Sequence, residues 1–122
     1  MGKKVLVVDD SVTVRQQVSS ALSRAGFEVL EAADGRQGLN VIASTQDLKL
    51  VVSDVNMPHM DGLEMLERMR ASDTNASVPV VMLTTEGQRD LIARAKQAGA
   101  KGWIVKPFKA DLLIAAAKKL TG

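Results

Sequence analysis

Acidic, hydroxyl and amino side chains follow four of the short apolar runs in this sequence. Asp9 and Asp10 follow the first run, Asp54 follows the third, and Thr84 and Lys106 follow the fourth and fifth. Carboxylates that lie close together repel each other and raise each other's pKa unless positive charge is supplied. Lys106 supplies one positive charge, and a divalent cation is the natural second. Because an all-oxygen ligand set suits Mg²⁺, the pattern predicts a magnesium and phosphate site.

The apolar runs predict the strands that bring these residues together. They occupy residues 5–8, 29–30, 50–52, 80–83 and 103–105, and they begin 21 to 30 residues apart. Continuous runs rich in β-branched residues are typical of strands that are buried on both faces. The spacing accommodates one strand, one helix and two loops in each repeat.

Helical patterns fill the intervening segments. In the first, Val14, Val18 and Leu22 share one helical face, Ser11 is a candidate N-cap and Gly26 a candidate terminator. Shorter stripes follow over residues 39–43, 63–69, 91–98 and 113–120, with an Asp61–Glu64 capping box before one and Gly99 after another. This order predicts an α/β fold with a doubly wound, five-stranded parallel sheet, (βα)₅, covered by helices on both faces.

Ligands of such sheets bind at the carboxyl ends of the strands. All the residues named in the first paragraph are expected at that edge, together with Glu31, which follows the second run. The first turn reads Asp9-Asp10-Ser11 and lacks the glycines of a dinucleotide-binding loop, which excludes that class of site.

Composition excludes several other classes. The chain has 122 residues, of which 46% are hydrophobic and 25% charged, and these values predict one globular domain over residues 1–122. It has no cysteine and one histidine, His59, which argues against disulfide scaffolds, thiolate metal sites and zinc sites. We expect a cytoplasmic protein without membrane insertion, because no apolar run approaches about 18 residues.

The charge is uneven along the chain. Residues 1–61 contain 8 acidic and 6 basic side chains, whereas residues 62–122 contain 6 acidic and 10 basic ones. A basic face favours an acidic protein partner. Binding to nucleic acid is not expected, because aromatic residues make up only 2% of the chain, too few to provide a stacking platform.

Three stretches resemble the response-regulator receiver domain, and the likeness extends from Lys3 to Leu120. They are Val8-Asp9-Asp10-Ser11, then Asp54-Val55-Asn56-Met57-Pro58 with Asp61-Gly62, and Lys106-Pro107-Phe108. The resemblance is to the stand-alone chemotaxis type, which implies a monomer without an output domain. It also implies a flavodoxin-like sheet in the strand order 2-1-3-4-5.

The resemblance assigns a role to each site residue. Asp54 is the expected phosphoacceptor, and Mg²⁺ is expected on Asp10, on Asp54 and on the backbone carbonyl of Asn56, with Asp9 acting through a water molecule. Lys106 would stabilise the transferring phosphoryl group, and Thr84 would bind it afterwards.

Two further positions carry implied roles. Trp103 stands at the position of an aromatic switch residue, although an aromatic core residue at a strand start is an equal alternative. Asn56 and Glu86 are implied to tune the lifetime of the phosphoryl group, which we expect to be short. The Lys106–Pro107 peptide bond is expected to be cis.

The implied partners are a sensor histidine kinase, a downstream target protein such as the flagellar motor switch, and a phosphatase. The expected output surface comprises the fourth helix, the fifth strand and the fifth helix. Two alternatives remain: a Mg²⁺-dependent phosphotransferase or phosphatase that acts in trans, and a docking module that is never phosphorylated. The first lacks a substrate-binding insertion, and the intact acidic and basic residues argue against the second.

Overall fold

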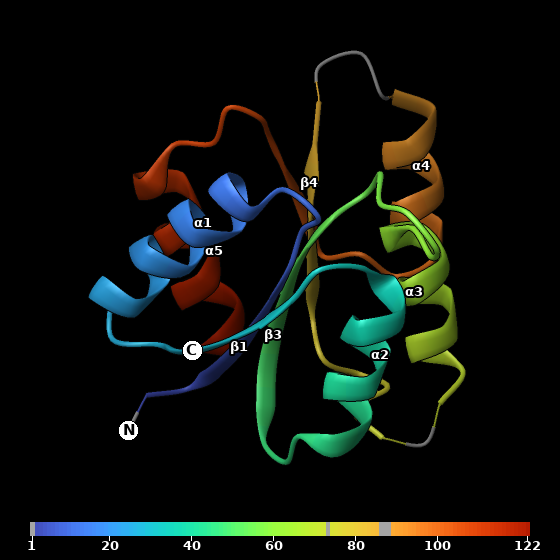
Figure 1. The fold of residues 1–122 in the computed structure, drawn as a ribbon, viewed down its shortest axis with the longest axis horizontal. Helices are drawn as coiled ribbons and strands as arrows, with labels where there is room; N and C mark the ends of the chain where they lie inside the picture. Colours follow the sequence, from blue (N-terminus) through green and yellow to red (C-terminus); the bar gives the residue numbers. More distant parts are fainter. Residues whose placement is uncertain (1, 73, 86–88) are drawn as a thin grey trace.

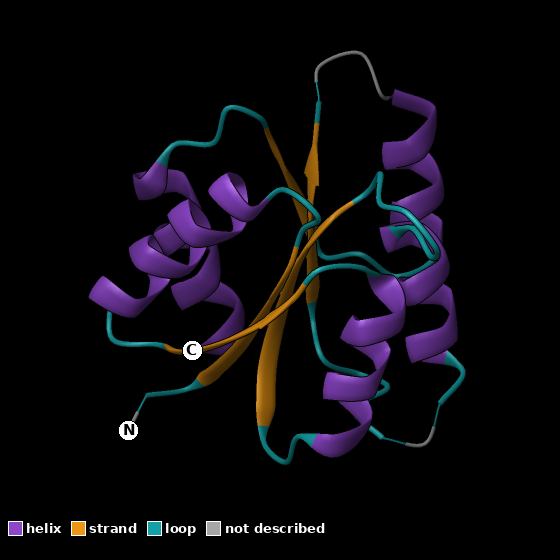
Figure 2. Ribbon diagram, in the orientation of Figure 1, coloured by secondary structure: helices purple, strands orange, loops and turns teal. Residues whose placement is uncertain are grey.

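The computed structural model describes residues 2–72, 74–85 and 89–122. Strands and helices alternate along the described chain, as Figures 1 and 2 show. The strands are β1 (Lys4–Val8), β2 (Glu28–Ala32), β3 (Leu48–Asp54), β4 (Val80–Thr84) and β5 (Gly102–Val105). The helices are α1 (Val12–Arg24), α2 (Gly35–Ser44), α3 (Gly62–Arg70), α4 (Arg89–Gln97) and α5 (Ala110–Thr121).

The strands form one parallel sheet in the order β2-β1-β3-β4-β5. This confirms the predicted doubly wound α/β fold, with the flavodoxin-like strand order. The three inner strands are buried almost throughout, in accordance with their continuous apolar runs. The edge strand β5 instead alternates between half-buried and exposed residues.

Helices cover both faces of the sheet. Figure 1 shows α1 and α5 on one side, and α2, α3 and α4 on the other. Each side has its own apolar core: Val18 and Leu22 of α1 pack with Leu113 of α5, whereas Ile42 of α2 packs with the residues of α3. The predicted helical stripes therefore supply the two layers that sandwich the sheet.

Local signals in the sequence set the helix ends. The Ser11 side chain accepts a hydrogen bond from the backbone N–H of Val14, and Asp61 accepts one from the N–H of Glu64. Gly26 and Gly99, which follow α1 and α4, have φ values of +98° and +100°, a region that glycine enters without a steric penalty. These caps confirm the predicted boundaries.

The exposure of Trp103 decides between its two predicted environments, since it contradicts the alternative of a buried core residue. It lies on β5 with 42% of its surface exposed, so the alternative of an aromatic core residue is wrong. The physical reason is the position of β5 at the edge of the sheet, where every second side chain faces outward.

No helix within the described residues is long and apolar enough to cross a membrane.

Candidate functional site

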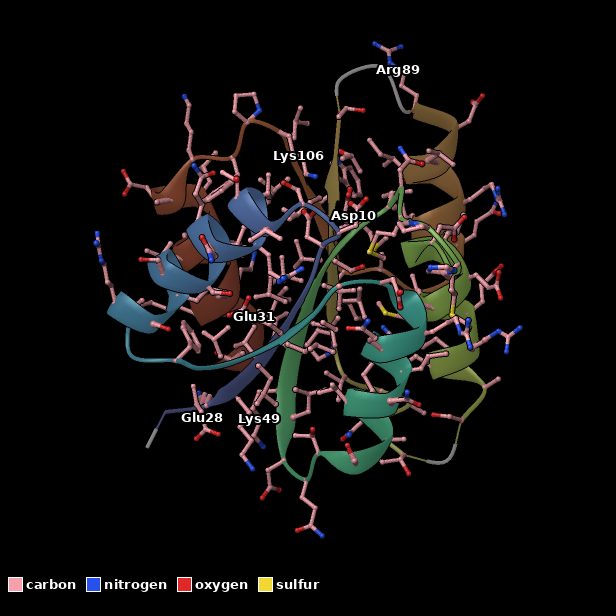
Figure 3. The ribbon with its side chains drawn as sticks, in the orientation of Figure 1. Asp10, Glu28, Glu31, Lys49, Arg89 and Lys106 are labelled. Carbon is pink, nitrogen blue, oxygen red and sulfur yellow. The ribbon has the colours of Figure 1, made fainter. Side chains whose placement is uncertain are left out.

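The carboxyl ends of the strands bring the predicted site residues together. Asp54 is the last residue of β3, Thr84 is the last of β4, and Asp9 and Lys106 directly follow β1 and β5. Figure 3 shows Asp10 and Lys106 at the same upper end of the sheet. Residues from four strands therefore meet at one edge, as the parallel topology requires.

Three carboxylates form the acidic part of the site. Asp9, Asp10 and Asp54 each offer an oxygen, and these oxygens lie within 4.8 Å of one another. Asp9 is fully buried and Asp54 is 8% exposed, whereas Asp10 is exposed to solvent. The cluster thus extends from the interior of the sheet to its rim and is open on the side of Asp10.

Lys106 provides the positive charge of the site. Its Nζ lies 3.2 Å from Asp9 Oδ2 and 3.3 Å from Asp54 Oδ1, so one ammonium group pairs with two carboxylates. The Lys106–Pro107 peptide bond is cis, as the resemblance implies. The Lys106 backbone N–H donates to the carbonyl of Thr84, which ties the β5 end to the β4 end.

The charges within this group do not balance. Burial raises the pKa of the Asp54 carboxyl group, since a charged group loses hydration inside the sheet. The Lys106 ammonium group lowers this pKa, but Asp9 raises it again, and the net direction is upward. A second cation beside Asp54 would offset the excess negative charge, and carboxylate oxygens are the ligands that Mg²⁺ prefers. The donor set of this edge therefore fits Mg²⁺.

Thr84 carries an unused hydroxyl group at the same edge. Thr84 is 1% exposed, and its Oγ1 atom has no hydrogen-bond partner among the described residues. Buried polar groups are rarely left without a partner, because desolvation then has no compensation. The hydroxyl group is therefore available to an additional hydrogen-bond partner at this edge.

The loop between β3 and α3 lies against Asp54. The N–H of Gly62 donates to the carbonyl of Val55 at 2.9 Å, which closes the loop. A Cβ atom on Gly62 would lie 2.1 Å from the backbone oxygen of Asp54, so only glycine allows this approach. Asn56, whose carbonyl is the expected metal ligand, lies exposed in the same loop.

Other predicted positions lie outside this group. Glu31 is predicted at the edge, but it lies within β2, which continues to Ala32, and it pairs with Arg15. The apolar run ends before the strand does, because Glu31 is an exposed polar residue inside an edge strand. Glu86, the second expected lifetime residue, falls outside the described residues. His59 is exposed in the β3–α3 loop.

Arg15 is a residue of the site that the sequence patterns do not predict. Its Nη1 donates to the backbone carbonyl of Asp9 at 2.8 Å, directly behind the acidic cluster. A signal is present in the sequence, since Arg15 lies in the first turn of α1, where the helix dipole disfavours a cation. A basic residue in that position, shortly after two aspartates, indicates that its side chain binds a nearby hydrogen-bond acceptor.

Comparisons with known proteins point to one family. The sequence model of the response regulator receiver domain matches residues 5–118. The chain is 40% identical over 111 residues to the chemotaxis protein CheY1 of Helicobacter pylori, which is 90% of each chain. It is also 40% identical over 111 residues to the CheY homolog of Campylobacter jejuni, covering 90% of this chain and 85% of that protein.

Solved structures give the same result. The chemotaxis protein CheY4 of Vibrio cholerae superimposes with a TM-score of 0.91 at 40% identity, over 98% of this chain and 99% of that one. The receiver domain of NtrX from Brucella abortus gives a TM-score of 0.88 at 34% identity, over 96% and 97% of the two chains. Because sequence, strand order and overall structure all agree, the chain belongs to the response regulator receiver domain family as a CheY-like member.

Proposed function

We propose that the protein is a signalling switch that accepts a phosphoryl group on Asp54. One observation carries the proposal: a largely buried Asp54 carboxylate pairs with Lys106 at 3.3 Å within a cluster of three aspartates. A structural ion pair needs one carboxylate for each ammonium group. Three carboxylates around one lysine support a site for a cation and an anionic ligand.

The proposed reaction is a transfer to a carboxylate oxygen. An Asp54 oxygen attacks the phosphorus atom, a new O–P bond forms, and the bond from phosphorus to the donor's leaving group breaks with its electron pair. Water later attacks the same phosphorus, which releases inorganic phosphate and restores the carboxylate. The protein thus catalyses only its own phosphorylation and dephosphorylation.

Each residue has a proposed part in this reaction. Asp10, Asp54 and the Asn56 carbonyl would hold Mg²⁺, with Asp9 acting through water. When bound, Mg²⁺ supplies positive charge that neutralises the phosphoryl oxygens. Lys106 binds another of these oxygens and stabilises the charge that develops in the transition state.

The switch is proposed to run from Thr84 to Trp103. The unpartnered Thr84 hydroxyl donates to a phosphoryl oxygen only when the phosphate is present, which gives the two states a difference in binding energy. Trp103 lies outward on β5, paired in register with Met82, two residues before Thr84. Rotation of its indole inward would alter the surface over α4, β5 and α5.

That surface is the proposed output face. Of the nine residues of α4, all of which the structure describes, only Ala95 is buried, and such thin packing is typical of an element that moves. The lysines and arginines of this output face favour an acidic target protein. A sensor histidine kinase is the proposed donor of the phosphoryl group, and the proposed location of the protein is the cytoplasm. The names of the CheY relatives support chemotaxis as the pathway. The flagellar motor switch is the proposed target, and a phosphatase is the proposed partner that ends the signal.

Intact mass after incubation with acetyl phosphate tests the proposal. We expect one added phosphoryl group on the wild type with Mg²⁺, none with EDTA, and none on Asp54→Asn. Because rapid hydrolysis would hide the adduct, beryllofluoride replaces acetyl phosphate in a second arm, and the single tryptophan, Trp103, reports binding by fluorescence.

The two alternatives give different results in the same experiment. If the wild type shows no adduct and also no response to beryllofluoride, the proposal is refuted and the docking module remains. Repeated turnover of a phosphorylated metabolite would instead identify an enzyme that acts in trans.

A further inference from the structure

Asp9 is held by more contacts than a metal ligand acting through water would need. Its N–H donates to the Ala32 carbonyl, its Oδ1 accepts from the Ser11 N–H at 2.9 Å, and its Oδ2 accepts from Lys106 at 3.2 Å. Its carbonyl oxygen, the remaining polar atom, accepts from Arg15 at 2.8 Å. Every polar atom of Asp9 thus has a partner.

The carbonyl contact bears on the neighbouring aspartate. The Asp9 carbonyl belongs to the peptide plane that joins Asp9 to Asp10, and this plane is rigid. A hydrogen bond that fixes the carbonyl direction therefore fixes the position of the Asp10 Cα atom, from which the carboxylate side chain extends. Asp10 is the exposed member of the acidic cluster, and one of its carboxylate oxygens lies within 4.8 Å of oxygens of Asp9 and Asp54.

Arg15 itself is anchored from the other side. Its Nε lies 3.0 Å from Oε1 of Glu31, and its side chain is 18% exposed. The guanidinium group is a planar fork, so two hydrogen bonds at different nitrogens set its orientation. The Glu31 carboxylate, through Arg15, thereby reaches the Asp9–Asp10 peptide plane.

We propose that Arg15, held by Glu31, is a positioning residue that orients Asp10 for divalent-cation binding. The inference rests on the proposed function, because the cation is the one that phosphorylation requires. Charge alone predicts the opposite effect, since a cationic side chain near the cluster weakens the binding of another cation. Removing Arg15 therefore separates positioning from charge by the sign of the result.

The test measures Mg²⁺ binding to Arg15→Gln by titration calorimetry at fixed ionic strength. We expect affinity to fall roughly tenfold, the lower end of the usual cost of losing a group that orients a metal ligand. The rate of phosphorylation by acetyl phosphate at saturating Mg²⁺ is expected to stay within about twofold of wild type, so that the Mg²⁺ requirement shifts and the maximal rate does not. An unchanged affinity, a tighter one, or a lost maximal rate would overturn the proposal.

Two further variants guard against an effect on folding. Glu31→Gln leaves Arg15 in place without its anchor and should weaken Mg²⁺ binding less than Arg15→Gln does. The double variant should bind no more weakly than Arg15→Gln, because Glu31 acts through Arg15. Additive losses would refute this order. Thermal midpoints in EDTA compare the folded states.

The matched control is Arg68→Gln. Arg68 pairs with Glu64 at the same 3.0 Å separation, but on the exposed side of α3. We expect this variant to bind Mg²⁺ like the wild type. A wild type that neither binds Mg²⁺ nor accepts phosphate would refute the proposed function; a wild type that does both beside an unaltered Arg15→Gln would refute only the role of Arg15.

Discussion

The Lys106 ammonium group lies 3.3 Å from Asp54 Oδ1, yet the pKa of the Asp54 carboxyl group is raised. Burial at the end of β3 is the largest influence on this pKa, and the nearby Asp9 carboxylate adds to it. The ion pair therefore does not complete the charge balance of the site. The carboxylate is therefore a destabilised anion. Such an anion suits the proposed nucleophile, because a bound cation and a phosphoryl group would both relieve its charge.

We expect Asp54→Asn to be more stable than the wild type at neutral pH in EDTA. An acid whose folded-state pKa is raised contributes full stability below its unfolded pKa, near 3.8, and loses it as the pH rises through the folded-state value. The free energies of unfolding of the two proteins should thus converge as the pH falls toward 3.8. Urea denaturation at several pH values measures this difference. A wild type that is more stable than the variant at pH 7 would contradict it.

Lys106→Gln should slow phosphorylation by acetyl phosphate roughly 100-fold, the usual loss when one group that stabilises the transition state is removed. Mg²⁺ binding should tighten, because the competing ammonium group is gone. Mass spectrometry gives the rate and calorimetry the affinity. Lys101→Gln, at an exposed lysine just before β5, is the control and should match the wild type. Equal rates for the two variants would remove Lys106 from the reaction.

Thr84→Val should stabilise the fold by about 1 kcal/mol, because it replaces an unpartnered buried hydroxyl group with a methyl group. The same variant should still bind beryllofluoride, as measured by calorimetry, but lose the fluorescence response of Trp103. Ser19→Ala is the matched control, since Ser19 Oγ is also buried without a partner among the described residues. It should be stabilised as well and keep the full response. A normal response in Thr84→Val would refute the switch role.

Gly62→Ala should lower the free energy of unfolding by about 3 kcal/mol and slow phosphorylation, because its Cβ would lie 2.1 Å from the Asp54 backbone oxygen. Gly102→Ala is the control, since a Cβ atom there meets nothing within 4 Å. Urea midpoints measure both. Similar midpoints would show that the β3–α3 loop relaxes without disturbing Asp54.

The fold is predictable from the sequence because continuous apolar runs and helix caps are local signals. The same reasoning places Asp9, Asp54 and Lys106 together, since parallel strands end at a common edge. It does not give the order of the strands. Crossover connections of similar length reach either neighbour, so the order follows only from the family resemblance.

The misplaced residues share a physical cause. Glu31 and Trp103 both lie on edge strands, β2 and β5, where polar and exposed positions interrupt the apolar pattern. No motif predicts the bond of Arg15 to Asp9, because its acceptor is a backbone carbonyl, and the place of Arg15 early in α1 is a signal only that it needs some partner. The single-domain boundary and the chemical roles of all the site residues, Asn56 and Glu86 included, stay predictions.

The contact between Lys106 and Asp9 joins residues that are 97 positions apart. No fragment that lacks either Asp9 or Lys106 contains both halves of this pair, and no local folding intermediate can assemble it. Under the proposed function, competence for phosphorylation would therefore report the fraction of molecules that are completely folded. Under the proposed function Mg²⁺ would bind only the folded state, so its concentration would extend protein lifetime against proteolysis as well as set readiness to signal.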